Sequence, residues 1–184
     1  SIPSIRPESV TEKLAKLLVA GKQKSVTMAP DAASPKMLSI TCKGMDADAL
    51  VSATKVLLSQ GVHRLKLYFM VGLPKESDED IEAIADLSRR IADAGYGSKA
   101  VHISVNPLVP KPHTPFQWES LEEVGLLKRK LKVIQNGIKG EKRIEMIHDL
   151  PKWAYIQALL SRGDRRVGKI LLAAYHTQGN WRQA

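Results

Sequence analysis

The chain has 184 residues, of which 28 are lysine or arginine and 19 are aspartate or glutamate, so its formal net charge is +9. Hydrophobic residues make up 43% and charged residues 26%, which is typical of a globular protein and not of a disordered one. No apolar run approaches the roughly 20 residues of a membrane span, and the first residues do not form a signal peptide. A single cysteine, Cys42, excludes an internal disulfide and an iron–sulfur cluster held by thiolates of this chain alone. These features predict a cytoplasmic protein that makes no membrane contact.

The excess positive charge is concentrated toward the C-terminus. Residues 117–184 carry 13 basic and 7 acidic side chains, a net charge of +6, whereas residues 1–116 carry a net charge of +3. A basic surface attracts polyanions such as nucleic acids. Charged runs on helices are also typical of solvated faces, and the aromatic content of 5% gives little support to a platform for stacked bases. Both interpretations stay open at this point.

Short segments rich in β-branched and apolar residues recur along the chain and predict strands: Lys24–Ala29, Arg64–Val71 and Ala100–Pro107. Helix-type patterns fill the intervals, so the sequence predicts βα units and a parallel sheet. Arg143–His148 is a candidate fourth strand. Two further helices are expected over about Lys152–Ser161 and Asp164–Thr177.

Several of the expected helices begin with capping signals. Capping boxes are predicted at Ser9–Glu12, Ser77–Asp80 and Ser120–Glu123, and single N-caps at Ser34 and Asp46. The two C-terminal helices are expected to bury one apolar face each, formed by Trp153, Ile156, Leu159 and Leu160 and by Val167, Ile170, Leu171 and Ala174.

The predicted strands have one apolar and one polar face. In Arg64–Val71, for example, the side chains of Leu65, Leu67 and Phe69 alternate with those of Lys66 and Tyr68. A sheet covered by helices on both faces would be apolar throughout. The pattern therefore favours an α/β fold in which a partial TIM-like (βα) barrel encloses a polar ligand. The alternative is a sheet with helices on one face only, the other face being wet or covered by a partner.

Three motifs then resemble radical S-adenosylmethionine (radical SAM) enzymes. Residues 68–80, YFMVGLPKESDED, resemble a strand and its GLP-x-E-[ST]-x-x-D segment. Residues 106–116, NPLVPKPHTPF, resemble the next strand and its P-x-P-G-T-P loop, with His113 where many members have glycine. Residues 26–38, VTMAPDAASPKML, resemble an earlier strand that usually ends in Glu or Gln, and Ser4–Pro7 is similar to the strand end before it. The order and spacing make the resemblance specific, to a subgroup of unassigned function that often carries a cobalamin-binding-like domain.

The resemblance implies a barrel enzyme that cleaves S-adenosylmethionine (SAM) reductively at a [4Fe–4S] cluster, an oxidoreductase-like reaction. The family holds the cluster on a C-x3-C-x2-C loop, whereas Cys42 stands alone. We therefore expect the cluster ligands upstream of Ser1, no metal ligand in this chain, and an inactive isolated chain. Residues 1–140 would be the C-terminal part of a barrel truncated on its N-terminal side, and residues 141–184 a short strand and helical extension. The missing N-terminal half is the expected partner, and cobalamin is a further candidate cofactor of the full-length protein.

The resemblance also implies a SAM site formed by Ser4, Arg6, Asp31, Lys66, Tyr68, Gly72, Asn106 and Val109. Ser4 and Arg6 match positions near the methionine moiety, where Arg6 could pair with the carboxylate. Asp31 matches a residue that contacts the ribose hydroxyls, and its alternative role is to cap the helix that follows Ser34.

The remaining site residues come from two strands and their ends. Lys66 and Tyr68 match inward positions near the ribose and carboxylate, although a structural lysine is an equal alternative and Tyr68 replaces an acid found in some relatives. Gly72 allows close backbone approach. The segment from Asn106 to Val109 matches the one that lies along the adenine. The resemblance gives no role to His102, which is typical of a hydrogen-bonded polar residue on a strand.

The leading hypothesis is that the chain is the C-terminal part of a radical SAM core. It would form the SAM pocket and part of the cavity for a small-molecule or RNA substrate. The alternative is a basic RNA- or nucleic-acid-associated module with residues 117–184 as its working surface. A phosphate-binding barrel is disfavoured because no Gly-rich phosphate loop follows a late strand. An exposed edge of the truncated barrel predicts self-association of the fragment.

Overall fold

The architecture was taken from a computed structural model, which describes residues 4–181. Four parallel strands form one sheet in chain order. They are β1 (Val26–Asp31), β2 (Leu65–Val71), β3 (Val101–Pro107) and β4 (Ile144–Ile147). All four lie within two residues of their predicted positions. Each connection leads from one strand to its immediate neighbour in the order β1-β2-β3-β4, so the connecting helices lie next to one another.

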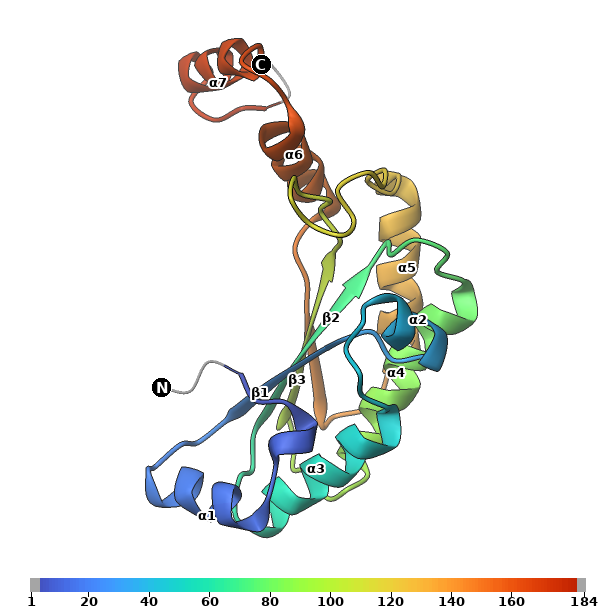
Figure 1. Cartoon of the computed structure of the whole chain (residues 1–184), viewed down its shortest axis with the longest axis vertical. Coiled ribbons are helices and arrows are strands. Elements are labelled where there is room, and N and C mark those ends of the chain that lie inside the picture. The colour runs from blue at the N-terminus through green and yellow to red at the C-terminus, as the bar shows by residue number, and fades with distance from the viewer. Residues whose placement is uncertain (1–3, 182–184) are drawn as a thin grey trace.

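The helices between the strands cover one face of this sheet (Figure 1). A short 3-10 helix, η1 (Pro7–Ser9), and α1 (Glu12–Ala20) precede β1. Later connections contain α2 (Pro35–Ile40), α3 (Ala47–Ser59), α4 (Asp78–Ala92) and α5 (Val124–Gly137), and β4 is followed by α6 (Pro151–Arg162) and α7 (Val167–His176). Within the described residues no helix combines the length and apolarity that a membrane span needs. The chain is thus a mixed α/β fold consistent with a partial TIM-like (βα) barrel.

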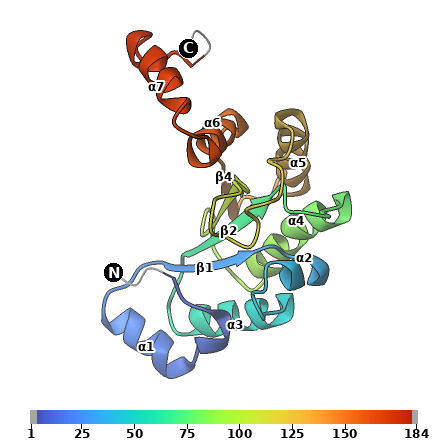
Figure 2. The same cartoon turned by 45° about the horizontal axis from the view of Figure 1, so that its top comes forward.

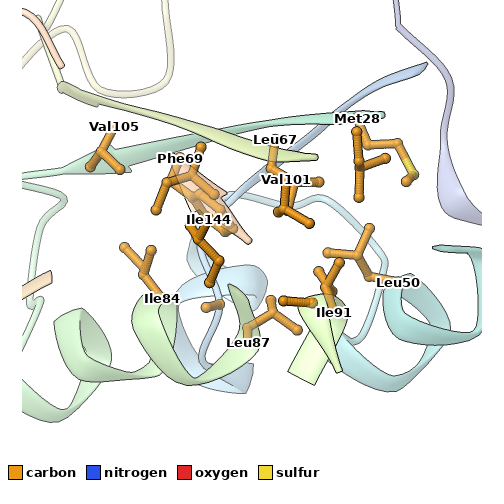
Figure 3. Packing of buried hydrophobic residues seen from close by; sticks show 14 of the residues in the cluster. Met28, Leu50, Leu67, Phe69, Ile84, Leu87, Ile91, Val101, Val105 and Ile144 are labelled. Carbon is orange, nitrogen blue, oxygen red and sulfur yellow. The ribbon is translucent and has the colours of Figure 1, made fainter. Parts of the chain in front are cut away.

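The main core lies between the sheet and helices α1, α3, α4 and α5. Figure 3 shows residues of this core, among them several of α3 and α4. Met28, Leu67 and Phe69 point from the strands toward Leu50 and Ile84 on the helices, and all five side chains are buried. Every second residue of β2 and β3 belongs to this layer because strand side chains alternate between faces. The prediction of one apolar and one polar face per strand is confirmed.

A second, smaller apolar cluster closes the carboxyl end of the sheet. Leu73 and Leu108, which follow β2 and β3, pack with Met37 and Leu38 of α2, and Met70 is partly buried against them. The open face of β2 is therefore polar at Lys66 and Tyr68 but apolar at Met70. This cluster anchors the loops in which several of the predicted site residues lie.

The N-cap predictions are confirmed for Ser34, Asp46 and Ser77. The Ser34 hydroxyl accepts a hydrogen bond from the Met37 amide and the Asp46 carboxylate accepts one from the Ala49 amide. Ser77 and Asp80 form the predicted capping box of α4.

Two predicted capping boxes are wrong. Thr11, and not Ser9, caps α1, because Ser9 belongs to η1 and its hydroxyl donates to the Arg6 carbonyl. At the start of α5 the N-cap is Glu123 without a side-chain bond, so the Ser120 box is not formed.

The buried faces predicted for the two C-terminal helices are wrong for several of their large side chains and confirmed for Ala174. Trp153, Leu160 and Leu171 are 40%, 40% and 46% exposed. The residues that α6 buries are instead the small Ala154 and Ala158, whereas α7 buries the predicted Ala174. Both helices extend away from the sheet (Figures 1 and 2), so their larger apolar side chains have little of the molecule to pack against.

Candidate functional site

A polar row crosses the uncovered face of the sheet. Thr27, Lys66, His102 and Glu145 are successive register partners on β1, β2, β3 and β4. The first three lie between buried neighbours and Glu145 lies between buried Ile144 and half-buried Met146, so strand alternation directs each side chain away from the helices. A second row, one step toward the carboxyl ends, contains Tyr68, Ser104 and Ile147. The first row is thus polar across all four strands, whereas the second row ends in the exposed apolar side chain of Ile147.

One ion-pair contact and two hydrogen bonds tie this surface together on the β3 side. His102 Nδ1 lies 3.2 Å from Glu145 Oε2. Asn106 Nδ2 donates to the Ser104 hydroxyl at 3.1 Å, and Asn106 Oδ1 accepts from the Asp149 amide at 3.1 Å. The carboxyl half of β3 is therefore connected to the loop that follows β4.

A hollow of about 390 Å³ lies over the amino half of the sheet. It is lined by Lys24, Ser25, Arg64, Lys66, Leu67, Tyr68, His102, Ser104 and Ile147. Within residues 4–181, no carboxylate forms an ion pair with Lys24, Arg64 or Lys66. Hydroxyl groups and unpaired cations on one concave surface suit a ligand that carries an anionic group.

The carboxyl end of β1 is irregular. The register shifts between Met28 and Asp31, a stretch that contains Pro30, and Asp31, the partner of Phe69, has a positive φ of 64°. Proline is compatible with an edge strand and a bulge because it lacks a ladder donor. Asp31 Oδ2 pairs with Lys43 Nζ at 2.6 Å. The alternative role of Asp31 as a helix cap is wrong, because the Ser34 hydroxyl caps α2.

The carboxyl end of β2 holds a buried ionic cluster. The side chain of Glu76 is 2% exposed, and its Oε2 accepts from the Gly72 amide at 2.7 Å and from Lys130 Nζ at 2.8 Å. Lys130 also pairs with Glu122. Burial raises the pKa of Glu76 above its usual value, although the bonds from Lys130 and Gly72 oppose this shift. The Gly-Leu-Pro-x-Glu motif therefore joins the β2 loop to α5.

A second buried carboxylate joins α2 to α4. Asp80 Oδ1 accepts from the Ser34 hydroxyl at 2.6 Å, and Asp80 Oδ2 lies 2.5 Å from Lys36 Nζ. Burial tends to raise the pKa of Asp80, but bonds from Lys36, Ser34 and Ser77 outweigh it and hold the pKa well below its usual value. The carboxylate is thus charged and fixes the segment that follows Asp31.

The structure brings the predicted site residues to three neighbouring places. Lys66 and Tyr68 lie in the middle of the open face, and the Asn106 side chain lies beyond them on β3. Asp31, Gly72 and Val109 lie at or just past the carboxyl ends of β1, β2 and β3. Ser4 and Arg6 lie beside the outer edge of β1, where the Ile5 amide donates to the Thr27 carbonyl at 2.9 Å.

The sequence prediction missed Glu145 and assigned no role to His102 or Ser104. The alternation of β3 already directed His102 and Ser104 to the open face, but a four-residue strand gave no register for Glu145. Within residues 4–181, no group of three or more His, Cys, Asp or Glu side chains could hold a metal ion. Cys42 is exposed in the turn after α2.

The chain is similar in sequence to one protein family and to two curated proteins. Residues 1–88 match the model of the radical SAM superfamily. The chain is 34% identical over 168 residues to an uncharacterized protein of Methanocaldococcus jannaschii, which covers 91% of this chain and 36% of the relative. It is 30% identical over 88 residues to an uncharacterized methyltransferase of Pyrococcus horikoshii, which covers 48% of this chain and 19% of the relative. The chain therefore spans about a third of the first relative and about a fifth of the second.

Proposed function

Because residues 1–88 of this chain belong to the radical SAM superfamily, we propose that the chain forms part of the SAM pocket and one wall of the substrate cavity of a radical SAM enzyme. The observation that carries the proposal is the uncovered, polar face of a parallel sheet whose other face is packed with helices. An enzyme of this class needs a polar wall where the sheet meets its ligands. The similarity to an uncharacterized methyltransferase also supports SAM as the ligand, because SAM is a common methyl donor.

The residues of this chain fit the polar groups of SAM. Lys66 lies in the centre of the open face, where an ammonium can pair with the methionine carboxylate. Asp31 can accept hydrogen bonds from ribose hydroxyls, and its ion pair with Lys43 holds the carboxylate in place for this. Gly72 would allow close backbone approach, and the backbone from Asn106 to Val109 would lie along the adenine. Ser4 and Arg6 would complete the site from the β1 edge.

The residues of this chain do not fit a [4Fe–4S] cluster. Its one cysteine, Cys42, is exposed in a turn and has no second thiolate in the sequence. We propose that the cluster ligands belong to a longer protein, in line with the greater length of the relatives. Because it lacks those ligands, the isolated chain would be inactive. Cobalamin stays a candidate cofactor of the longer protein.

The proposed site can be tested by equilibrium binding of SAM to the reconstituted protein that carries this chain. Lys66→Ala and Asp31→Asn should each weaken SAM binding by about tenfold, the loss expected for one charge-assisted hydrogen bond. Lys55→Ala is a matched control because Lys55 is an exposed lysine on α3. Unchanged affinity in both site variants would reject these assignments.

A further inference from the structure

A second concave site, separate from the open face, lies among the C-terminal helices. A cavity of about 470 Å³ is formed between α5, α6, α7 and the segment that follows α7. It is lined by Val124, Lys128, Lys152, Trp153, Tyr155, Ile156, Leu159, Ile170, Gly179, Asn180 and Trp181. Three of these side chains are aromatic and two are lysines, and no acidic residue is among the described residues of the lining.

Aromatic side chains are concentrated in this part of the chain. Five of the nine Phe, Trp and Tyr residues lie within residues 117–184, although aromatic residues make up only 5% of the whole. Tyr155 is 58%, Tyr175 78% and Trp118 87% exposed. Trp118 lies next to Glu119, whose carbonyl accepts a 2.7 Å bond from Arg162 at the end of α6. Exposed aromatic groups at this density indicate a binding surface and not a core.

The cations around the cavity are available to a ligand. Lys128 and Lys132 lie one turn apart on α5, and Lys152 Nζ lies 4.8 Å from the centre of the Trp153 ring. None of these three lysines forms an ion pair with another described residue, in contrast to Lys130 on the same helix. Part of the net charge of +6 over residues 117–184 therefore lies beside the exposed aromatic rings.

We propose that this cavity binds single-stranded nucleic acid. Bases would stack on Trp153 and Tyr155, while Lys128 and Lys152 would contact the adjoining phosphates. Aromatic side chains next to lysines are the combination that holds unpaired strands, because every base has a flat face and every nucleotide carries a negative charge. A duplex would be a poorer ligand, since its bases are already stacked on one another. This surface is independent of the SAM site on the sheet.

The test is a titration of the 184-residue chain with RNA and DNA oligonucleotides of about 12 nucleotides, followed by tryptophan fluorescence at several salt concentrations. A matched abasic oligonucleotide keeps the phosphates and removes the bases. We expect tighter binding of the normal strand than of the abasic strand, and tighter binding than of the same sequence as a duplex. Equal affinity for normal and abasic strands, or no binding at low salt, would overturn the proposal.

Variants separate the two kinds of contact. Trp153→Ala and Tyr155→Ala should each weaken binding of the normal strand about tenfold and leave abasic binding unchanged. Lys128→Gln should weaken both and lower the slope of log K against log salt by about 0.7. Lys55→Gln, on α3 at the opposite end of the molecule (Figure 1), should change neither. Tyr155 is 58% exposed, so its variant should keep the parent circular dichroism spectrum.

Two alternatives are decided in the same experiment. Preference for vesicles of anionic lipid over oligonucleotides would assign the exposed leucines and lysines to a membrane surface and would overturn the proposal. Preference for an acidic peptide over both strands would overturn it in favour of a protein partner. Because SAM binding is measured separately on the reconstituted protein, loss of either activity does not imply loss of the other.

Discussion

His102 on β3 and Glu145 on β4 are register partners whose side chains meet on the open face of the sheet, with Nδ1 3.2 Å from Oε2. A carboxylate facing one ring nitrogen fixes the orientation of the imidazole and selects the tautomer of its neutral form. His102 also lines the hollow beside Lys66 and Ser104. The open face is therefore an ordered polar surface and not a set of unrelated exposed side chains.

The first prediction concerns the tautomer of His102. In its neutral form the proton should be on Nδ1, because this is the ring nitrogen that faces the Glu145 carboxylate. Nitrogen-15 NMR of the histidine rings reports this directly. Glu145→Ala should return His102 to the more common Nε2–H form, while the exposed His63 should give the same spectrum in both proteins. A parent His102 with its proton on Nε2 would contradict the pairing.

The second prediction concerns the ionic cluster at the end of β2. Lys130→Met should lower the free energy of unfolding by about 3–5 kcal/mol, because Glu76 and Glu122 would lose the cation between them. Urea denaturation measures the loss. Arg129→Met is the matched control, since Arg129 pairs with Asp78 at the exposed surface of the same helix. Equal effects of the two substitutions would show that the cluster does not stabilise the fold.

The third prediction is a pH dependence that comes from Asp80. Its folded-state pKa lies below the unfolded value of about 3.9, so its carboxylate stabilises the fold fully above that pH and progressively less below it. Asp80→Asn should lower the free energy of unfolding by about 2 kcal/mol at pH 7. The difference between the parent and Asp80→Asn should shrink as the pH falls below about 4. A difference that stays constant between pH 7 and pH 3 would contradict the role of the charge.

The fourth prediction concerns the backbone turn after β2. Gly72 has φ +81°, and a Cβ there would lie 2.9 Å from Leu127 Cδ2 and 3.1 Å from Glu122 Cβ. An alanine at a positive φ costs about 1–2 kcal/mol of stability for its backbone conformation. Gly72→Ala should therefore lose this amount and, in addition, the cost of the steric contacts. Gly44→Ala provides the control, because Gly44 has φ +62° with nothing within 4 Å of its Cβ position. Thermal unfolding should show a larger loss for Gly72→Ala, and equal losses would rule out the steric term.

The sheet was well predicted from the sequence because each strand is a short apolar run with strict alternation. Lys66 and His102 were placed on the polar face by that alternation alone. The partnership of His102 with Glu145 was not predictable, since it depends on the register of β4 against β3. The exposed faces of α6 and α7 were also missed: their periodicity matches that of buried helices, and whether anything covers Trp153 or Leu171 is decided by tertiary packing.

The candidate site was predicted only in part, because motif resemblance marks residues but not their long-range partners. Motif resemblance marked Gly72, but the structure shows that Glu76 of the same motif is a buried anchor between the β2 loop and α5. Asp31 was marked as a strand-end acid, and its pairing with Lys43 depends on a turn that the sequence does not specify. Long-range ion pairs of this kind are invisible to local patterns.

The most direct test of the account is hydrogen–deuterium exchange of the reconstituted protein with and without SAM. We expect SAM to slow exchange in the open-face strands and the loops at their carboxyl ends, in peptides that contain Lys66 to Gly72 and Asn106 to Val109. Peptides from α3 and α4, which cover the opposite face, should be unchanged. Protection confined to those helices, or SAM binding with no protection of β2 and β3, would contradict the assignment of the open face as the ligand wall.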